Sequence, residues 1–182
     1  MAATNRLNEK VFSDGIRKAK IAIEYAIIER LKRAAEELII DAEFSQGYQN
    51  LTGNTLTSYA IGIYSRGELR EYIDIFEVEE GLEKPTMPKL STGKGWIKVQ
   101  RYGGGEAFVY QDTLEQTDRD YGYNTSRRFL EYYSPKTNGF ELVMCTGTEY
   151  SEYLEDRGLN VLTETFMLSP RVFLNNLKRI RL

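Results

Sequence analysis

An acidic segment near the C-terminus holds the first residues that could do chemistry. Glu149, Glu152, Glu155 and Asp156 stand within residues 149–156. Paired carboxylates can hydrolyse glycosides or bind Mg²⁺. The segment lacks the Asp-x-Asp spacing of a metal-binding loop, however, and its pattern predicts a short exposed helix. The favoured interpretation is a solvated face, or an acidic edge that forms ion pairs with a neighbouring subunit.

Basic residues that could pair with this acidic edge lie in the N-terminal part of the chain. They share one long predicted helix and comprise Arg17, Lys18, Lys20, Arg30, Lys32 and Arg33. Contact between this basic face and the acidic helix of a neighbour is a hypothesis. The candidate subunit interface comprises Arg17, Lys18, Arg30, Arg33, Trp96, Tyr102, Glu149, Glu152 and Glu155.

The composition argues against most catalytic and metal-binding classes. The chain of 182 residues contains no histidine and one cysteine, Cys145. Its formal net charge is −3. The commonest general acid/base and the usual neutral metal ligand are therefore missing. A single cysteine excludes an internal disulfide and fits a buried thiol in a reducing compartment. We therefore expect no enzyme activity, no cofactor and no metal.

Ordinary structural roles explain three further motifs. Gly103-Gly104-Gly105 lacks the Lys-Ser/Thr that follows in a phosphate-binding loop, so a hairpin tip is the better interpretation. The basic residues Lys178, Arg179 and Arg181 stabilise a helix C-terminus, and non-specific contact with DNA is the alternative. Trp96 and Tyr102 alternate with basic residues, a pattern that a packed strand explains. An aromatic groove around Trp96 would instead make the chain a carbohydrate- or protein-binding module.

The elements that position these residues follow from periodicity. Apolar residues with helical spacing predict a long helix over residues 13–43, capped by Ser13 or Asp14. Turn formers occupy 44–55, and alternation predicts strands at 56–65 and 69–78 around a hairpin turn at 66–68. The predicted class is α+β, with a long N-terminal helix packed on a small antiparallel sheet.

The middle of the chain differs in composition from both ends. Residues 80–139 are rich in glycine and contain three of the four prolines, which indicates an insertion or arm within a single domain, 1–182. Short strands are expected at 96–102 and 107–110, and a helix at 125–133. Beyond it we expect a strand at 140–146, a helix at 149–156 ended by Gly158, and a strand or extended turn at 161–166. A last helix should begin with Ser169 as N-cap and Pro170 as its first residue.

Two short motifs and the order of the elements resemble a known family. Leu51-Thr52-Gly53-Asn54-Thr55-Leu56-Thr57-Ser58-Tyr59 follows the long helix, and Gly147-Thr148-Glu149-Tyr150-Ser151-Glu152-Tyr153-Leu154-Glu155 follows the last strand. In both respects the chain resembles the tail-completion and head–tail joining proteins of tailed phages, the group of the lambda-type minor tail protein Z. The resemblance covers about two thirds of the chain. Ser151 stands where the family usually has alanine, and the 80–139 segment has no counterpart.

The resemblance implies a function as well as a fold. It implies a structural virion protein of the phage neck or tail, assembled in the host cytoplasm as a homo-oligomeric ring. The ring would contact the portal or adjacent neck and tail proteins, and packaged DNA at most non-specifically. No membrane association is expected, because no apolar run is long enough to span a bilayer.

Overall fold

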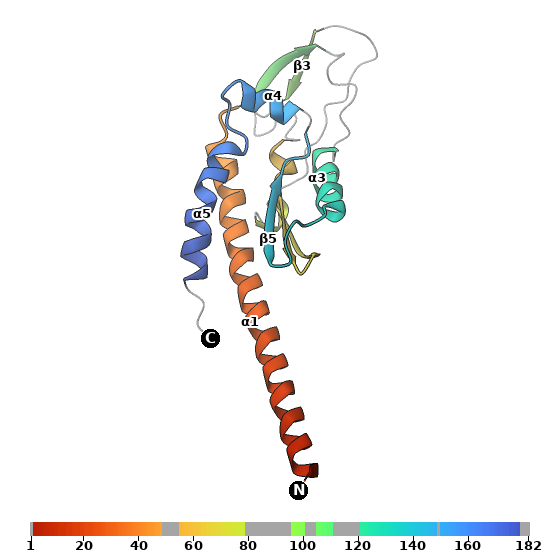
Figure 1. Cartoon of the computed structure of the whole chain (residues 1–182). Helices are drawn as coiled ribbons and strands as arrows, with labels where there is room; N and C mark the ends of the chain where they lie inside the picture. Colours follow the sequence, from red (N-terminus) through yellow and green to blue (C-terminus); the bar gives the residue numbers. More distant parts are fainter. Residues whose placement is uncertain are drawn as a thin grey trace.

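A three-stranded antiparallel sheet forms the centre of the molecule, and it lies between two helices (Figure 1). The structure is a computed structural model that describes residues 2–48, 55–78, 96–100, 105–110, 121–148 and 150–178. Its elements are α1 (Ala2–Ser45), η1 (Leu56–Ser58), β1 (Ala60–Ser65), β2 (Glu68–Asp74), α2 (Ile75–Val78), β3 (Trp96–Gln100), β4 (Glu106–Tyr110), α3 (Tyr121–Tyr132), β5 (Phe140–Cys145), α4 (Tyr150–Asp156) and α5 (Thr163–Leu177). The predicted α+β class is confirmed.

The central strand, β1, is buried along its whole length because both faces of the sheet are covered. The strand order is β2-β1-β5, so β5 has only β1 as a neighbour in the described sheet. Ile61 and Ile63 belong to the core cluster that includes α1. On the other face, the hydroxyl of Tyr64 donates a hydrogen bond of 2.6 Å to the carbonyl oxygen of Leu130 in α3. Side chains alternate along the strand, so those on one face pack against α1 and those on the other face contact α3.

Only the C-terminal half of α1 packs against this body. Its buried residues are Leu31, Ala34, Ala35, Leu38, Ile39 and Ala42. Helix α5 runs antiparallel to this half of α1 (Figure 1) and is joined to it by two side-chain hydrogen bonds. Thr165 donates to Asp41 at 2.8 Å, and Asn176 donates to Glu37 at 3.1 Å. The N-terminal half of α1 leaves the body and projects from it.

The long N-terminal helix is confirmed, but its predicted start is wrong. The helix begins at Ala2 and not after Ser13. The hydroxyl of Ser13 donates backward to the carbonyl oxygen of Lys10 at 2.9 Å, as a serine inside a helix does. Asp14 pairs with Arg17 at 3.2 Å. Both candidate caps are thus engaged inside a helix that begins at Ala2.

Both strands of the first hairpin are shorter than predicted. Leu56–Ser58 is a 3₁₀ turn, because the carbonyl oxygen of Thr55 accepts hydrogen bonds from the amide and the hydroxyl of Ser58. β2 ends at Asp74, whose carboxylate accepts the amide of Phe76 at 2.9 Å and so starts α2. The predicted turn is confirmed, and it carries positive φ at Arg66 (55°) and Gly67 (82°), as two-residue hairpin loops require.

The C-terminal helix begins six residues earlier than its predicted N-cap. α5 starts at Thr163, so the strand or extended turn expected at 161–166 is wrong, and Pro170 lies inside the helix. Proline cannot donate to the carbonyl oxygen of Phe166 four residues before it. That oxygen instead accepts the hydroxyl of Ser169 at 2.7 Å.

The 80–139 segment contains a described hairpin and a helix. β3 and β4 pair antiparallel, with Trp96 opposite Tyr110, and in Figure 1 they lie at the end of the molecule opposite the N-terminus. α3 covers 121–132; its Leu130 carbonyl oxygen accepts the Tyr64 hydroxyl of β1, and its Ser126 hydroxyl donates to the carbonyl oxygen of Ser58 in η1. This helix therefore belongs to the body, although the sequence placed it within the insertion. The TGN turn at 52–54 lies outside the described residues.

Candidate functional site

The projecting half of α1 carries a row of exposed apolar side chains, which we call the ridge. The ridge consists of Phe12, Ile16, Ala19 and Ile23, at intervals of four, three and four residues. Phe12 is 70% exposed, Ile16 is 42% exposed and Ile23 is 39% exposed. Residues with this spacing lie on one side of a helix. The row leads toward Ile27, which packs against the core, so the ridge continues a buried stripe beyond the body.

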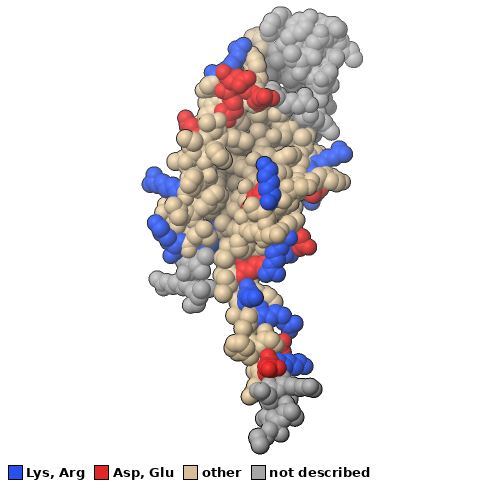
Figure 2. Space-filling view, in the orientation of Figure 1, with Lys and Arg blue, Asp and Glu red and all other residues tan. Residues whose placement is uncertain are grey.

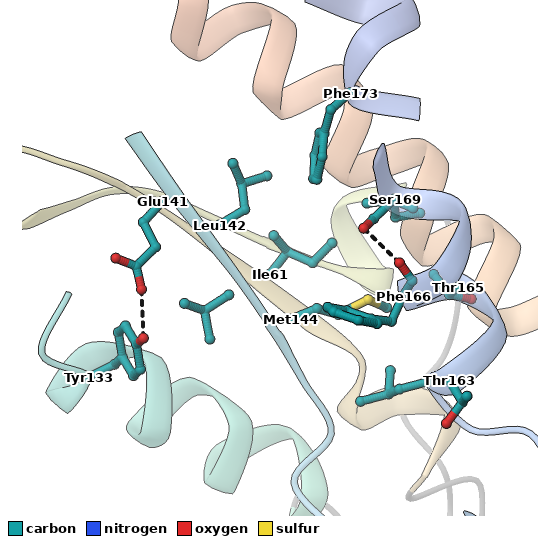
Figure 3. A pocket seen from close by; sticks show the side chains of 13 residues that line it. Ile61, Tyr133, Glu141, Leu142, Met144, Thr163, Thr165, Phe166, Ser169 and Phe173 are labelled. Carbon is teal, nitrogen blue, oxygen red and sulfur yellow. Dashed lines mark hydrogen bonds between the residues drawn. The ribbon is translucent and has the colours of Figure 1, made fainter. Parts of the chain in front are cut away.

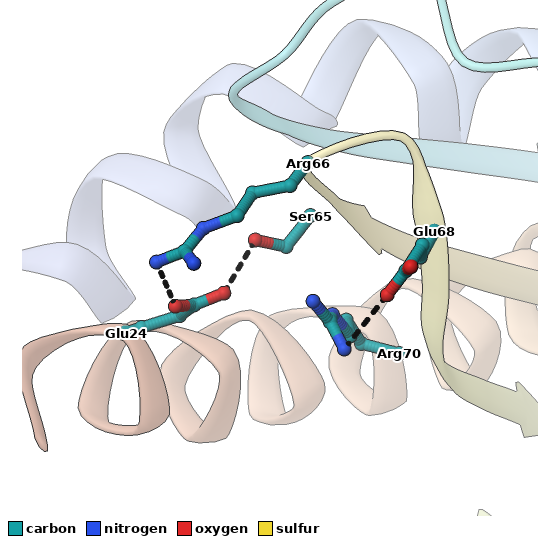
Figure 4. Close-up of polar contacts among 5 residues, drawn as sticks. All are labelled: Glu24, Ser65, Arg66, Glu68 and Arg70. Carbon is teal, nitrogen blue, oxygen red and sulfur yellow. Dashed lines mark hydrogen bonds and ion pairs between the residues drawn. The ribbon is translucent and has the colours of Figure 1, made fainter. Parts of the chain in front are cut away.

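A polar contact marks the point where α1 leaves the body (Figure 4). The carboxylate of Glu24 accepts hydrogen bonds from the Ser65 hydroxyl at 2.8 Å and from the Arg66 guanidinium at 2.5 Å. Both donors belong to the tip of the β1–β2 hairpin. Beside this contact a shallow hollow of about 250 Å³ is lined by Ile23, Phe140 and neighbouring residues. The contact joins α1 to the hairpin tip, and the ridge lies on its N-terminal side.

An apolar groove of about 580 Å³ separates β5 from α5. Figure 3 shows Phe166 and Phe173 from α5 facing Leu142 and Met144 from β5. Leu38 of α1 also lines the groove. We call this feature the β5–α5 groove. Because β5 has a strand neighbour only on its β1 side in the described sheet, the groove lies along an open sheet edge.

The main acidic group of the groove is already used within the chain. The carboxylate of Glu141 accepts the hydroxyl of Tyr133 at 2.6 Å and the amides of Lys136 and Thr137 at 2.8 and 3.2 Å. The hydrogen bond from Tyr133 is the main cause that lowers the pKa of Glu141. Glu141 is thus a charged carboxylate that holds the loop before β5, and it is poorly suited to proton transfer at neutral pH.

The side chain of Glu155 caps the N-terminus of α5. One carboxylate oxygen accepts the amides of Val161, Leu162 and Thr163 at 3.0, 2.5 and 3.0 Å, and the other accepts the hydroxyl of Thr163 at 2.8 Å. Burial alone would raise the pKa of Glu155, but these hydrogen bonds outweigh it and lower the pKa. The carboxylate therefore satisfies the free amides at a helix N-terminus.

Asn160 links the two helices that frame the groove. Its side-chain amide donates to the carbonyl oxygen of Ser45 at the end of α1 at 3.0 Å. Its side-chain oxygen accepts the amide of Glu164 in the first turn of α5 at 2.9 Å. The amide of Gly47 also donates to the carbonyl oxygen of Asn160 at 3.2 Å. One asparagine therefore caps both helices and fixes α5 against α1.

A cluster of hydroxyl groups joins the segments around 55–58 and 146–151. It contains Thr55, Ser58, Ser126, Thr146, Thr148 and Ser151. Ser151 lies 2.5 Å from Thr148 and 3.3 Å from Thr146, oxygen to oxygen. Ser151 thus takes part in a buried network where an alanine could not. No histidine or carboxylate is among these partners, so the cluster is a structural joint.

Gly147 is required by close packing at the same joint. A Cβ atom at this position would lie 2.0 Å from the carbonyl oxygen of Gly122 and 2.6 Å from the amide nitrogen of Ser126. Both atoms belong to the backbone of α3, which cannot move aside cheaply. The loop between β5 and α4 therefore contacts α3 directly.

Cys145 lies beside this joint. Its sulfur donates to the carbonyl oxygen of Ser126 at 3.8 Å, and burial raises the pKa of the thiol to about 11. A thiol with this pKa carries almost no thiolate at neutral pH. The thiol is free and half-buried.

The candidate interface residues are spread over the molecule. Arg17 and Lys18 are exposed on the projecting half of α1, while Arg33 is exposed and Arg30 half-buried nearer the body. Glu152 is exposed on α4, which Figure 1 places at the other end of α1. Arg17 and Lys18 therefore do not meet the acidic helix within one chain.

The structure describes no side chain at three of the candidate interface positions. Glu149 and Tyr102 lie outside the described residues, and Trp96 is described only as part of strand β3. The structure therefore does not test the aromatic groove expected around Trp96. Of the C-terminal basic residues, Lys178 follows α5, and Arg179 and Arg181 lie outside the described part.

The surface charge is uneven. Figure 2 shows Asp and Glu side chains gathered near the α4 end of the body, and Lys and Arg side chains spread over its middle and on the projecting helix. Among the described residues, no group of three or more His, Cys, Asp or Glu side chains is placed to hold a metal ion. No helix in the same part of the chain is long and apolar enough to cross a membrane.

The fold and these surfaces define an α+β protein with a projecting helix and an open apolar groove. No protein-family model, no curated protein and no solved structure matches the chain. The helical apolar spacing over residues 13–43 predicts that Ile16, Ala19 and Ile23 face a core, and this prediction is wrong, because the body reaches only the C-terminal half of α1 and leaves them exposed. The groove was not found from the sequence.

Proposed function

We propose that this chain is a non-catalytic structural subunit of a tailed-phage neck, which assembles with its own copies into a ring between the portal and the tail. The observation that carries the proposal is the ridge on the projecting half of α1. Apolar side chains that a single copy leaves in water are favourable to bury, at roughly 1.5–3 kcal/mol for a full isoleucine or phenylalanine side chain. The ridge therefore provides a driving force for association.

The family resemblance supports the same proposal from the sequence. Its two motifs meet in the fold, because Thr55 and Ser58 from the first contact Thr148, Thr146 and Ser126 around the second. The motif residues thus build one joint that holds α4 and η1 together. Under the proposal this joint stiffens the body, and the adjoining ring is a portal-side or tail-side protein.

Mass measurement and imaging of the purified full chain test the proposal. Light scattering should give a defined multiple of the 21.0 kDa chain mass, and negative-stain electron microscopy should show closed rings. A strictly monomeric protein at all concentrations, or an open polymer, would contradict the ring.

A genetic experiment tests the place in the virion. A stop codon early in the gene, in its native genome, should leave DNA-filled heads and tails unjoined, and a plasmid copy should restore joined particles. Normal virions from the disrupted genome would contradict the neck assignment.

A further inference from the structure

We infer that Asn138 is a site of spontaneous covalent modification, at which the side-chain amide is lost and an aspartate or isoaspartate residue forms. The inference is independent of the proposed ring. Asparagine is a heat-labile residue type, and it loses its amide when the backbone nitrogen of the next residue attacks the side-chain carbonyl carbon. Glycine at that next position obstructs the attack least, because it has no side chain. Asn138-Gly139 is the only Asn-Gly pair in the chain.

The reaction needs water as its only co-reactant. The backbone nitrogen of Gly139 bonds to Cγ of Asn138, and the bond between Cγ and Nδ2 breaks. Nδ2 takes the proton that the backbone nitrogen gives up and leaves as ammonia. Water then opens the resulting succinimide ring at one of its two carbonyl carbons. Attack at Cγ gives aspartate, and attack at the main-chain carbon gives isoaspartate, in which the main chain runs through Cγ.

Both reacting groups are accessible in the folded chain. Asn138 and Gly139 are exposed in the loop before β5. Among the described residues, no hydrogen bond engages the side chain of Asn138 or the amide of Gly139. A Cβ atom at Gly139 would have only the hydroxyl oxygen of Thr137 within reach, at 4.0 Å, so the space beside the amide is open. The amide can therefore turn toward the side chain that precedes it.

Other asparagines in the described part of the chain are protected. Asn160 is engaged at both ends of its side chain, by Ser45 and Glu164. The amide of Val161, which follows Asn160, donates to Glu155 at 3.0 Å. In a helix, the amide after an asparagine is bonded within the helix and cannot turn. The helical asparagines are Asn5, Asn8, Asn124, Asn175 and Asn176.

The modified residue would lie beside the contact at which α1 leaves the body (Figure 4). Asn138 and Gly139 line the same shallow hollow as Lys20, Glu24 and Arg66. A carboxylate at position 138 would add a negative charge to this hollow. Isoaspartate would also lengthen the main chain directly before Gly139, whose carbonyl oxygen accepts the amide of Arg66 at 3.3 Å. We therefore expect isoaspartate to weaken the hydrogen bond between the loop and the hairpin tip.

Mass spectrometry of the purified full chain tests the modification. The folded chain is kept near neutral pH for several weeks and is then digested with trypsin at mildly acidic pH, at which amide loss is slow. Trypsin gives peptides 137–157 and 158–171, in which Asn138 and Asn160 are the only side-chain amides. The first peptide should appear in amide, aspartate and isoaspartate forms, while the second keeps its amide. An unchanged first peptide, or equal loss from both, would overturn the inference.

Two variants separate the dipeptide from its surroundings. Gly139→Ala, which the open space accommodates, should strongly slow amide loss because its methyl group hinders the attack. Thr125→Gly, at an exposed position in α3, places a second Asn-Gly pair inside a helix, and Asn124 should keep its amide there. Loss from Asn138 that is as fast in Gly139→Ala as in wild type would overturn the inference. Equal loss from Asn124 and Asn138 in Thr125→Gly would overturn the argument that local structure selects the site.

Hydrogen exchange tests the structural consequence. The isoaspartate form is separated by ion exchange, and its Arg66 amide should exchange faster than that of the unmodified chain. Asn138→Asp is the matched control, because it carries the added charge on a main chain of ordinary length. Its Arg66 amide should exchange at nearly the wild-type rate. Equal exchange in the isoaspartate form and in Asn138→Asp would overturn the expected weakening at the hairpin tip.

Discussion

Replacement of Glu155 by glutamine should remove the charge that caps α5 while keeping the size of the side chain. The carboxylate accepts three backbone amides and one hydroxyl. Hydrogen bonds to a charged group contribute about 1.5–3 kcal/mol, and glutamine retains one acceptor oxygen. Because the side chain is only partly buried, we expect Glu155→Gln to lower the free energy of unfolding by about 1–2 kcal/mol. For a domain of this size, each kcal/mol lowers Tm by about 2–4 °C.

The pH dependence of this loss of stability shows whether the charge of Glu155 causes it. The pKa of Glu155 is lower in the folded chain than its ordinary value of about 4.5. The stabilisation it provides is therefore complete above the unfolded pKa and is lost as the pH falls through the folded pKa. The difference between wild type and Glu155→Gln should be largest at pH 7 and should shrink below about pH 4.5.

Urea unfolding followed by circular dichroism between pH 7 and pH 3.5 measures this difference. Glu152→Gln is the matched control, because Glu152 is exposed on the same short helix and should change the free energy of unfolding by less than about 0.5 kcal/mol. A difference for Glu155→Gln that stays constant with pH, or an equal loss for Glu152→Gln, would refute the capping argument.

Two further substitutions and one reactivity measurement test the packing beside the hydroxyl cluster and within α5. Gly147→Ala should destabilise the chain by about 3 kcal/mol or more in urea unfolding, because its Cβ would meet the backbone of α3; a loss below about 1 kcal/mol would contradict this packing. Pro170→Ala should stabilise the chain by about 1–2 kcal/mol, since alanine restores an amide inside α5; a lower Tm would contradict it. Cys145, with a thiol pKa of about 11, should react with a thiol reagent at pH 7 far more slowly than free cysteine, and at the same rate only after urea is added.

Local sequence patterns were sufficient for the fold class and for most elements. The run without glycine or proline after Gly15 predicts the long helix, and Arg66-Gly67 predicts the hairpin turn that the structure contains. Gly158, with φ of 71°, ends α4 as expected. These features depend on residues that are close together in the chain, so a local pattern is enough to find them.

Features that depend on contacts between different elements were not predicted, and the reason is physical. The start of α5 is set by Glu155 and Asn160, which lie before the helix, and not by the serine that precedes Pro170. The β5–α5 groove exists because α5 packs on α1, which fixes its distance from the sheet edge. Neither arrangement has a local pattern that a single sequence reveals.

Seven of the nine candidate interface residues are charged and two, Trp96 and Tyr102, are aromatic, whereas the structure exposes aliphatic and phenylalanine side chains on α1. Charged residues are common on any solvated surface, so Arg17 or Glu152 alone indicates little. The function of Glu155 became clear only when its hydrogen bonds to the start of α5 were known. The basic side chains of α1 stay a predicted interface, and the exposed apolar residues of the same helix are a second candidate surface.

The composition of the projecting half of α1 is the strongest physical ground for assembly. Lysine, glutamate and alanine form helices better than isoleucine or phenylalanine, which lose side-chain freedom against the preceding turn. A helix that only extended into solvent would gain nothing from Phe12, Ile16 and Ile23, and it would be less soluble for having them. These residues lower the free energy of the protein only when another surface covers them. The ridge is therefore the feature of this chain that best supports the proposed assembly.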